Sequence, residues 1–176
     1  AEKTEEVLKE RGVSAHYIID KEGNIKNIVP LERTAYHAGC KVDENKCVDI
    51  YKDINQRSIG IEIVNTGQET DKFTQEQYDS VNQLIDKIVA NKKYNVEKNH
   101  QQILGHYQIT TDKWDPSPNF DWNKIDLGDH QTVYGVKCPY DKTHALAKAG
   151  YPPANCPNDQ VETDTITDLD VIEEIL

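Results

Sequence analysis

The sequence predicts an α/β fold in which a mixed central β-sheet carries helices packed on it. Three observations lead to this prediction. Short runs of β-branched residues are bounded by turn-forming residues, which is typical of strands. One longer segment places apolar side chains at helical spacing. Strands and helices of this kind alternate along the chain, and such alternation favours a sheet with helices on its surface.

The expected elements follow from local signals along the chain. Gly12 can end a first helix, and Thr74 can cap a long one. Gly23 and Asn24 tolerate the positive φ of a tight hairpin turn. The elements in order are a helix over residues 4–11, strands over 13–20 and 25–30, a loop over 33–46, a strand over 58–65, a helix from 74 and a strand over 102–104. The long helix has one apolar stripe, formed by Tyr78, Val81, Leu84, Ile85 and Ile88.

The length and the charge distribution indicate one domain with a tail. Residues 1–125 are predicted to form the domain and residues 126–176 an acidic extension or linker, because the extension carries ten acidic residues against three lysines. The net charge of −11 argues against nucleic acid as a partner, since phosphate binding needs clustered Lys and Arg. No apolar run approaches the length of a membrane span.

The four cysteines fall into two neighbouring pairs, Cys40/Cys47 and Cys138/Cys156. No Cys-x-x-Cys spacing is present, which argues against a structural zinc finger. Two interpretations stay open. The pairs form two short-loop disulfides in an exported protein, or they are four reduced thiols in a cytosolic one.

Glu62 is the most informative residue of the predicted strand over 58–65. Side chains alternate between the two faces of a strand, so the three isoleucines of this segment share one face and Glu62 lies on the other. A carboxylate in the middle of a buried strand is costly unless it is paired or lies in a cleft. Glu62 is therefore interpreted as a partner of Arg57 or Arg33 in a buried ion pair, or as a general base whose pKa is raised by burial.

A second group of chemical residues follows the predicted strand over 102–104. His106 stands where that strand should end, and Asp115 directly precedes Pro116, which biases Asp115 toward an extended backbone. In an extended backbone Lys113 and Asp115 point to the same side. Such an arrangement suits a divalent metal held by His106 and Asp115, beside a cation for a developing negative charge. Taken alone, a His–Asp pair at this spacing is more often a surface or capping pair.

Four motifs occur in a fixed order over roughly residues 4–125. They are Ser14-Ala15-His16-Tyr17-Ile18-Ile19, Ala35-Tyr36-His37-Ala38-Gly39, Asn55-x-x-Ser58-Ile59-Gly60-Ile61-Glu62, and Gly105-His106-x-x-Ile109 followed by Lys113-x-Asp115-Pro116-x-Pro118-x-Phe120-Asp121-Trp122. This series resembles the type-2 N-acetylmuramoyl-L-alanine amidases, a peptidoglycan amidase family with the fold of the peptidoglycan recognition proteins. It resembles the bacterial branch, since the animal recognition proteins and phage lysozyme have Tyr where Ala15 stands and Cys where Asp115 stands.

The resemblance implies zinc-dependent hydrolysis of the amide bond between N-acetylmuramic acid and L-alanine in peptidoglycan or muropeptides. Glu62 would be the catalytic acid/base. His106 and Asp115 would be zinc ligands. Lys113 would stabilise the tetrahedral oxyanion.

The resemblance also implies that the substrate is contacted by Tyr36, His37 and Trp114, whose rings can face a sugar or a peptide. For His16 and His37, a hydrogen-bonded histidine that shapes the pocket is favoured over a metal ligand. A protein of this kind is expected to be secreted, periplasmic or in the cell wall, with a cytoplasmic recycling enzyme as the alternative.

The sequence departs from the family pattern at the first zinc ligand. In the family that ligand is a His at the end of an initial strand, just before the helix that corresponds to residues 4–11, and here no His precedes His16. Because the chain opens at Ala1 without Met, loss of the first strand by a cut is favoured over recruitment of His16 or His37. Zinc binding by this chain is then expected to be weak or absent. The alternatives to an amidase are a non-catalytic peptidoglycan-binding module and an interaction protein with an acidic tail.

Overall fold

The computed structural model describes residues 2–39, 51, 53–68, 70–99, 102–110, 113, 115–117 and 119–127. The regular elements of these ranges are α1 (Glu2–Glu10), β1 (Tyr17–Ile19), β2 (Ile25–Asn27), β3 (Ile61–Ile63) and α2 (Gln75–Ala90), with the 3₁₀ turns η2 (Ile54–Gln56), η3 (His106–Gln108) and η4 (Trp122–Lys124). The four cysteines, Trp114 and residues 128–176 lie outside the described residues, so the predictions made for them stay predictions.

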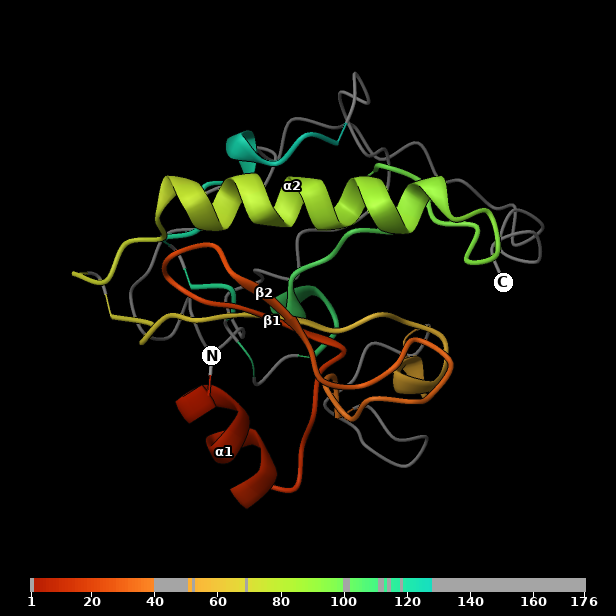
Figure 1. Cartoon of the computed structure of the whole chain (residues 1–176), viewed down its shortest axis with the longest axis horizontal. Helices are drawn as coiled ribbons and strands as arrows, with labels where there is room; N and C mark the ends of the chain where they lie inside the picture. Colours follow the sequence, from red (N-terminus) through yellow and green to blue (C-terminus); the bar gives the residue numbers. More distant parts are fainter. Residues whose placement is uncertain are drawn as a thin grey trace, which may run out of the picture.

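The three strands form a mixed sheet in the order β2-β1-β3. β1 and β2 are antiparallel and are joined by the predicted tight turn, in which Gly23 has a φ of 80°. β1 and β3 are parallel, with Ile18 opposite Glu62 in the register. In Figure 1, α2 runs above the strands and α1 lies below them. This mixed sheet with helices packed on it confirms the predicted fold class.

The main core lies between α2 and one face of the sheet. α2 begins at the predicted cap: the Thr74 hydroxyl accepts the Gln77 N–H, and the Gln77 side chain accepts the Thr74 N–H. The predicted apolar stripe of α2 is buried in this core together with Ile19. Packed on the same core are Ile59, Ile61 and Ile63. Because these isoleucines face α2, alternation along β3 directs Glu62 to the opposite face.

The strand predicted over residues 102–104 is wrong. The Gln102 N–H donates to the Asn99 side-chain oxygen at 2.9 Å, and the Ile103 N–H donates to the Asn99 carbonyl oxygen at 2.9 Å. Both donors are therefore used in a local turn and are not available to a sheet. The chain then enters η3 at His106.

The other predicted elements are present with different bounds. The first helix is α1, which is followed by Gly12 at a φ of 66°, as expected for a residue that ends a helix. β1, β2 and β3 lie inside the strands predicted over 13–20, 25–30 and 58–65 but are shorter. The local pattern therefore identified these elements but not their lengths.

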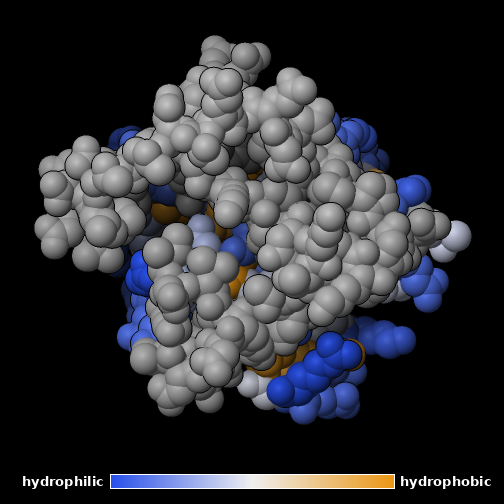
Figure 2. All heavy atoms as spheres, turned by 180° about the vertical axis from the view of Figure 1, so that it is seen from behind, coloured by the Kyte–Doolittle hydropathy of each residue, from blue (hydrophilic) through white to orange (hydrophobic). Residues whose placement is uncertain are grey.

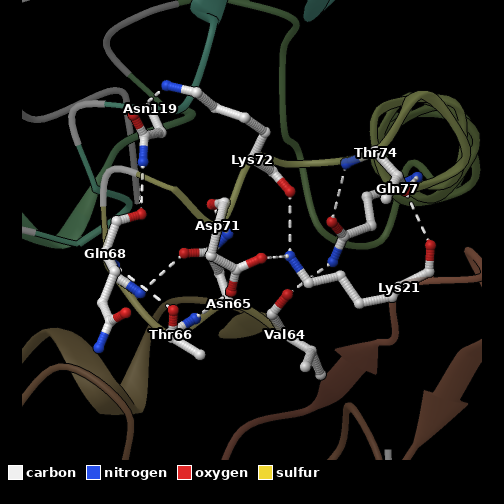
Figure 3. A network of polar contacts seen from close by, with 11 residues as sticks. Lys21, Val64, Asn65, Thr66, Gln68, Asp71, Lys72, Thr74, Gln77 and Asn119 are labelled. Atoms are coloured by element: carbon white, nitrogen blue, oxygen red, sulfur yellow. Dashed lines mark hydrogen bonds and ion pairs between the residues drawn. The ribbon is translucent and has the colours of Figure 1, made fainter.

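A polar network joins the β1–β2 turn to the connection between β3 and α2 (Figure 3). Lys21 Nζ lies 2.5 Å from Asp71 Oδ1 and donates to the Lys72 carbonyl oxygen at 3.0 Å. The second oxygen of Asp71 accepts the Thr66 N–H at 2.7 Å. The Thr74 hydroxyl donates to the Lys21 carbonyl oxygen at 2.8 Å. The network therefore anchors the N-terminus of α2 to residues about 50 positions earlier in the chain.

At the edges of the view from behind, the described surface is mainly hydrophilic, and small apolar areas show elsewhere in the same view (Figure 2). None of the helices in the described ranges has the length and apolar character needed to cross a membrane. Leu127 is 5% exposed and belongs to the main core, so the folded part reaches past residue 125. The boundary between domain and extension stays a prediction.

Candidate active site

His106 and Asp115 come together because the loop that carries Asp115 folds back on η3. The Tyr107 N–H donates to the Asp115 carbonyl oxygen at 3.2 Å. Gly105 has no room for a side chain, since a Cβ there would lie 2.5 Å from the Tyr107 ring and 3.0 Å from Pro116. The Gly-His pair of the sequence motif thus has a packing reason. As a result, His106 Nδ1 lies 2.9 Å from Asp115 Oδ2.

The hydrogen bonds of His106 leave one ring nitrogen for a cation. His106 Nε2 lies 3.0 Å from the Ala38 carbonyl oxygen, and a carbonyl oxygen only accepts, so Nε2 carries a proton. Nδ1 faces the Asp115 carboxylate, which is also an acceptor, so these two atoms share either a second proton or a metal ion. A backbone carbonyl behind the ring is the usual arrangement around a metal-binding imidazole. The His106–Asp115 pair therefore fits a metal ion as two of its donors.

A catalytic zinc takes three protein ligands. Within the described ranges, no group of three His, Cys, Asp or Glu side chains is arranged as a metal site. A complete zinc site would therefore need a third donor from outside these ranges. The two histidines considered for recruitment, His16 and His37, use their nitrogens elsewhere.

His16 is a buried structural histidine, as the pocket-shaping interpretation expects. Its Nδ1 accepts the Gly60 N–H at 3.0 Å, and its Nε2 donates to the Arg33 carbonyl oxygen at 3.0 Å. Burial lowers the pKa of His16 below its usual value. The ring therefore stays neutral near neutral pH and joins β1 to the start of β3.

His37 is engaged in the same way. Its ring packs on Gly60, where a Cβ would lie 2.3 Å from a ring carbon. Its Nδ1 lies 3.0 Å from the Ala35 carbonyl oxygen and its Nε2 2.9 Å from Ser58 Oγ, which in turn donates to the Ile54 carbonyl oxygen at 2.7 Å. A neutral ring and a hydroxyl carry two protons for these three contacts, so with Nδ1–H donating to Ala35 the Ser58 hydroxyl proton is shared between Nε2 and the Ile54 carbonyl oxygen. The engagement of both nitrogens favours the pocket-shaping interpretation over a substrate contact through them.

Acidification is expected to destabilise the fold through His37. Burial lowers the pKa of His37 from 6.5 to about 4. Below pH 6.5 the imidazole binds a proton in the unfolded chain but stays neutral in the folded chain. The contribution of His37 to the free energy of unfolding is therefore fully present above pH 6.5 and is lost as the pH falls toward 4. The loss from this residue reaches about 3 kcal/mol. Urea unfolding at pH 7 and pH 4.5 should show a smaller pH effect in His37→Gln than in the parent, and equal effects would contradict this account.

Glu62 lies in the middle of β3, on the face away from α2. Its side chain is exposed to solvent, so the expected full burial of Glu62 is wrong, whereas the raised pKa expected of a general base is present. The main core packs on the isoleucine face of β3, and on the other face Ile18 beside Glu62 is buried while Glu62 itself is exposed. Protein around the carboxyl still desolvates it, which raises the pKa of Glu62, and the Asp115 carboxylate raises it further. The charges of His106, Arg11 and Lys113 act in the opposite direction.

The charges at the site act on one another. Desolvation would raise the pKa of Asp115, but the hydrogen bond and charge of His106 outweigh it and lower that pKa. Burial would likewise lower the pKa of His106, and Asp115 raises it instead. Lys113 is exposed, and its charge acts on His106, Asp115 and Glu62. The structure thus brings four predicted residues within electrostatic reach of one another.

Tyr36 is 62% exposed, which fits a ring that offers its face to a sugar or a peptide. Two residues near the site were missed from the sequence. Arg11, just after α1, acts on the charge of Glu62. Asn55 binds the backbone of residues 37 and 38. Asn55 is the first residue of one of the sequence motifs, so the motif could have pointed to it. Arg11 is a basic residue just after a helix, a position that does not indicate a functional role.

Comparison with known proteins shows that the segment with the candidate site residues matches a known family. Residues 1–118 match the N-acetylmuramoyl-L-alanine amidase family. The chain is 33% identical over 114 residues to the 1,6-anhydro-N-acetylmuramyl-L-alanine amidase AmpD of Salmonella typhimurium. The matched residues make up 64% of this chain and 55% of AmpD. The chain thus spans little more than half the length of this curated relative.

Two solved structures have the same fold. The complex of E. coli AmiD with anhydro-N-acetylmuramic acid-L-Ala-D-gamma-Glu-L-Lys has a TM-score of 0.59 at 25% identity and covers 70% of this chain and 50% of AmiD. A selenomethionine derivative of AmpD has a TM-score of 0.52 at 31% identity and covers 64% of this chain and 57% of that one. All candidate site residues lie in the matched segment, residues 1–118.

Proposed function

Because this chain belongs to the type-2 N-acetylmuramoyl-L-alanine amidase family, we propose that it hydrolyses the amide bond between N-acetylmuramic acid and L-alanine in peptidoglycan or muropeptides. The observation that carries the proposal is the grouping of Glu62, His106, Lys113 and Asp115, whose charges act on one another although they come from two separate parts of the chain. A carboxyl with a raised pKa, a His–Asp pair and an ammonium group are the parts that amide hydrolysis needs.

The proposal includes zinc as the cofactor. His106, through Nδ1, and Asp115 would hold it, with the third ligand supplied from outside the described residues. When bound, zinc would act as a Lewis acid that polarises the scissile carbonyl and makes water more acidic. The Ala38 carbonyl supports this assignment, because it keeps one proton of His106 on Nε2, so that Nδ1, which faces the Asp115 carboxylate, is the nitrogen that can bind a metal.

Glu62 would act as the general base and then as the general acid. Its raised pKa suits a carboxylate that takes the proton of the attacking water and holds it long enough to pass it to the leaving amine. Its exposure gives water and substrate access to the carboxyl. Lys113 would face the oxygen of the scissile carbonyl and stabilise the negative charge that develops there.

The proposed substrate is a muropeptide, including the 1,6-anhydro form. The matched AmiD structure contains an anhydro-N-acetylmuramic acid peptide, and AmpD is named for the same anhydro sugar. Tyr36 and Trp114 would contact the sugar or the stem peptide. Peptidoglycan and its fragments occur outside the cytoplasm, so we propose that the protein acts as a secreted, periplasmic or cell-wall enzyme. The alternative is a cytoplasmic enzyme that recycles muropeptides.

The test is hydrolysis of a 1,6-anhydro-N-acetylmuramyl peptide by the full chain with added zinc. The expected product is a peptide that begins with L-alanine, detected by liquid chromatography and mass spectrometry. A chelator should reduce its release to background, and zinc should restore it. Binding of the muropeptide without cleavage in excess zinc would overturn the amidase and favour the alternative of a peptidoglycan-binding module.

A further inference from the structure

Asn55 holds the backbone of residues 37 and 38 through its side-chain oxygen. Asn55 Oδ1 accepts the His37 N–H at 3.2 Å and the Ala38 N–H at 2.8 Å. These contacts join positions 18 and 17 residues apart, so Asn55 does not serve as a cap for its own turn, η2. Two successive peptide groups converge on one oxygen, which fixes the orientation of both.

The segment that Asn55 holds also supports His106. The Ala38 carbonyl oxygen lies 3.0 Å from His106 Nε2. Immediately afterwards Gly39 adopts a φ of 65°, a conformation that favours glycine. The direction of the Ala38 carbonyl therefore depends on how the two preceding N–H groups are held. Without that restraint the acceptor would move away from Nε2, and the ring would lose the contact that sets its orientation.

Packing joins η2 and η3 into the same unit. Ala38 and Ile54 form a small buried cluster, with exposures of 2% and 9%. Tyr51 and Ile109 pack against this cluster. Ile54 directly precedes Asn55, and Ile109 directly follows η3. Asn55 is thus fixed relative to the element that carries His106, which allows it to act on the histidine through residues 37 and 38.

We propose that Asn55 is a positioning residue for His106. Through residues 37 and 38 it aims the Ala38 carbonyl at Nε2, so that Nδ1 keeps facing Asp115. The inference rests on the proposed function, because it treats His106 as a metal ligand. The hydrogen bond between His106 Nε2 and the Ala38 carbonyl oxygen can nevertheless be measured in protein without metal. Asn55 touches neither substrate nor metal in this role.

Three variants of the full chain separate positioning from general stability. Asn55→Ala removes the acceptor, and Asn55→Asp keeps an oxygen of the same reach. The matched control is Asn82→Ala. Asn82 Oδ1 accepts the Asp126 N–H at 2.8 Å and its Nδ2 donates to the Lys124 carbonyl oxygen at 2.8 Å, so it also joins two segments, but it does so from α2.

The first measurement is the exchange of the His106 Nε2 proton with water, followed by NMR in metal-free protein with labelled histidine. Loss of the Ala38 contact should speed this exchange on the order of tenfold in Asn55→Ala. Asn55→Asp and Asn82→Ala should keep the parent rate. An unchanged rate in Asn55→Ala, or an equal increase in Asn82→Ala, would overturn the inference.

The second measurement is zinc affinity, with zinc alone as the probe. Outer partners of a metal-binding histidine are worth about 10- to 100-fold in affinity, and Asn55→Ala should weaken zinc binding by about tenfold, with Asn55→Asp close to the parent. If neither parent nor variant binds zinc, the zinc part of the proposed function fails. The exchange rates then still decide whether Asn55 positions His106.

Discussion

Glu62→Gln is expected to lower turnover on muropeptide by about 10²- to 10⁴-fold, the usual contribution of a general acid/base. The amide keeps the size and shape of the side chain but can no longer take up the proton of the attacking water. Because Glu62 is exposed and lies outside the core, the free energy of unfolding should change by no more than about 0.5 kcal/mol. Zinc content should equal that of the parent.

The measurement is initial rate under saturating muropeptide, with unfolding in urea as the check on stability. Glu22→Gln is the matched control, since Glu22 is an exposed carboxylate in the β1–β2 turn. Its turnover should equal that of the parent. A Glu62→Gln protein that turns over normally would remove Glu62 from the mechanism. A variant that is destabilised but binds zinc as the parent does would instead identify Glu62 as a structural ion-pair partner.

In a protein whose zinc site includes its third ligand, Asp115→Ala should abolish both zinc retention and hydrolysis. The change removes one proposed ligand and leaves Nδ1 of His106 without the carboxylate that lies 2.9 Å away. Loss of a direct ligand should exceed the effect of an outer partner, so zinc affinity should fall by more than about 100-fold. Zinc content after dialysis, measured by elemental mass spectrometry, and turnover are the two readouts.

Asp79→Ala provides the control for that experiment. Asp79 is an exposed carboxylate on α2 that accepts a hydrogen bond from Gln75, and its removal should leave zinc content and turnover at the parent values. A zinc-replete Asp115→Ala protein with normal turnover would refute the assignment of Asp115 as a ligand.

The faces of β3 could be predicted because strand alternation is a local property. The isoleucines pack on the α2 side and Glu62 lies opposite, as the sequence alone indicated. The exposure of Glu62 could not be predicted, because its neighbour on the same face, Ile18, is fully buried and only the fold leaves Glu62 open to solvent. The strand predicted over residues 102–104 is absent for a different reason. Its apolar residues favour a strand, but the Asn99 side chain offers the backbone a nearer acceptor.

The grouping of His106, Lys113 and Asp115 could be predicted from their spacing and motif. The contribution of Asn55 could not, because its two acceptor contacts join distant positions and have no periodic signature. The same holds for Arg11, whose effect on Glu62 exists only after α1 has been placed below the sheet. Sequence patterns therefore indicated the chemical groups, while the residues that orient them needed the fold.

The parallel register of β1 and β3, with Ile18 opposite Glu62, limits how this chain can change in length. Inserting or deleting one residue beside Glu62 would turn the carboxylate into the core and an isoleucine toward the chemistry, since side-chain direction alternates at every position. The turn at residues 21–24 is not bound by this alternation. During divergence the chain can therefore gain or lose residues in such connections, whereas β3 can accept substitutions but no insertions or deletions.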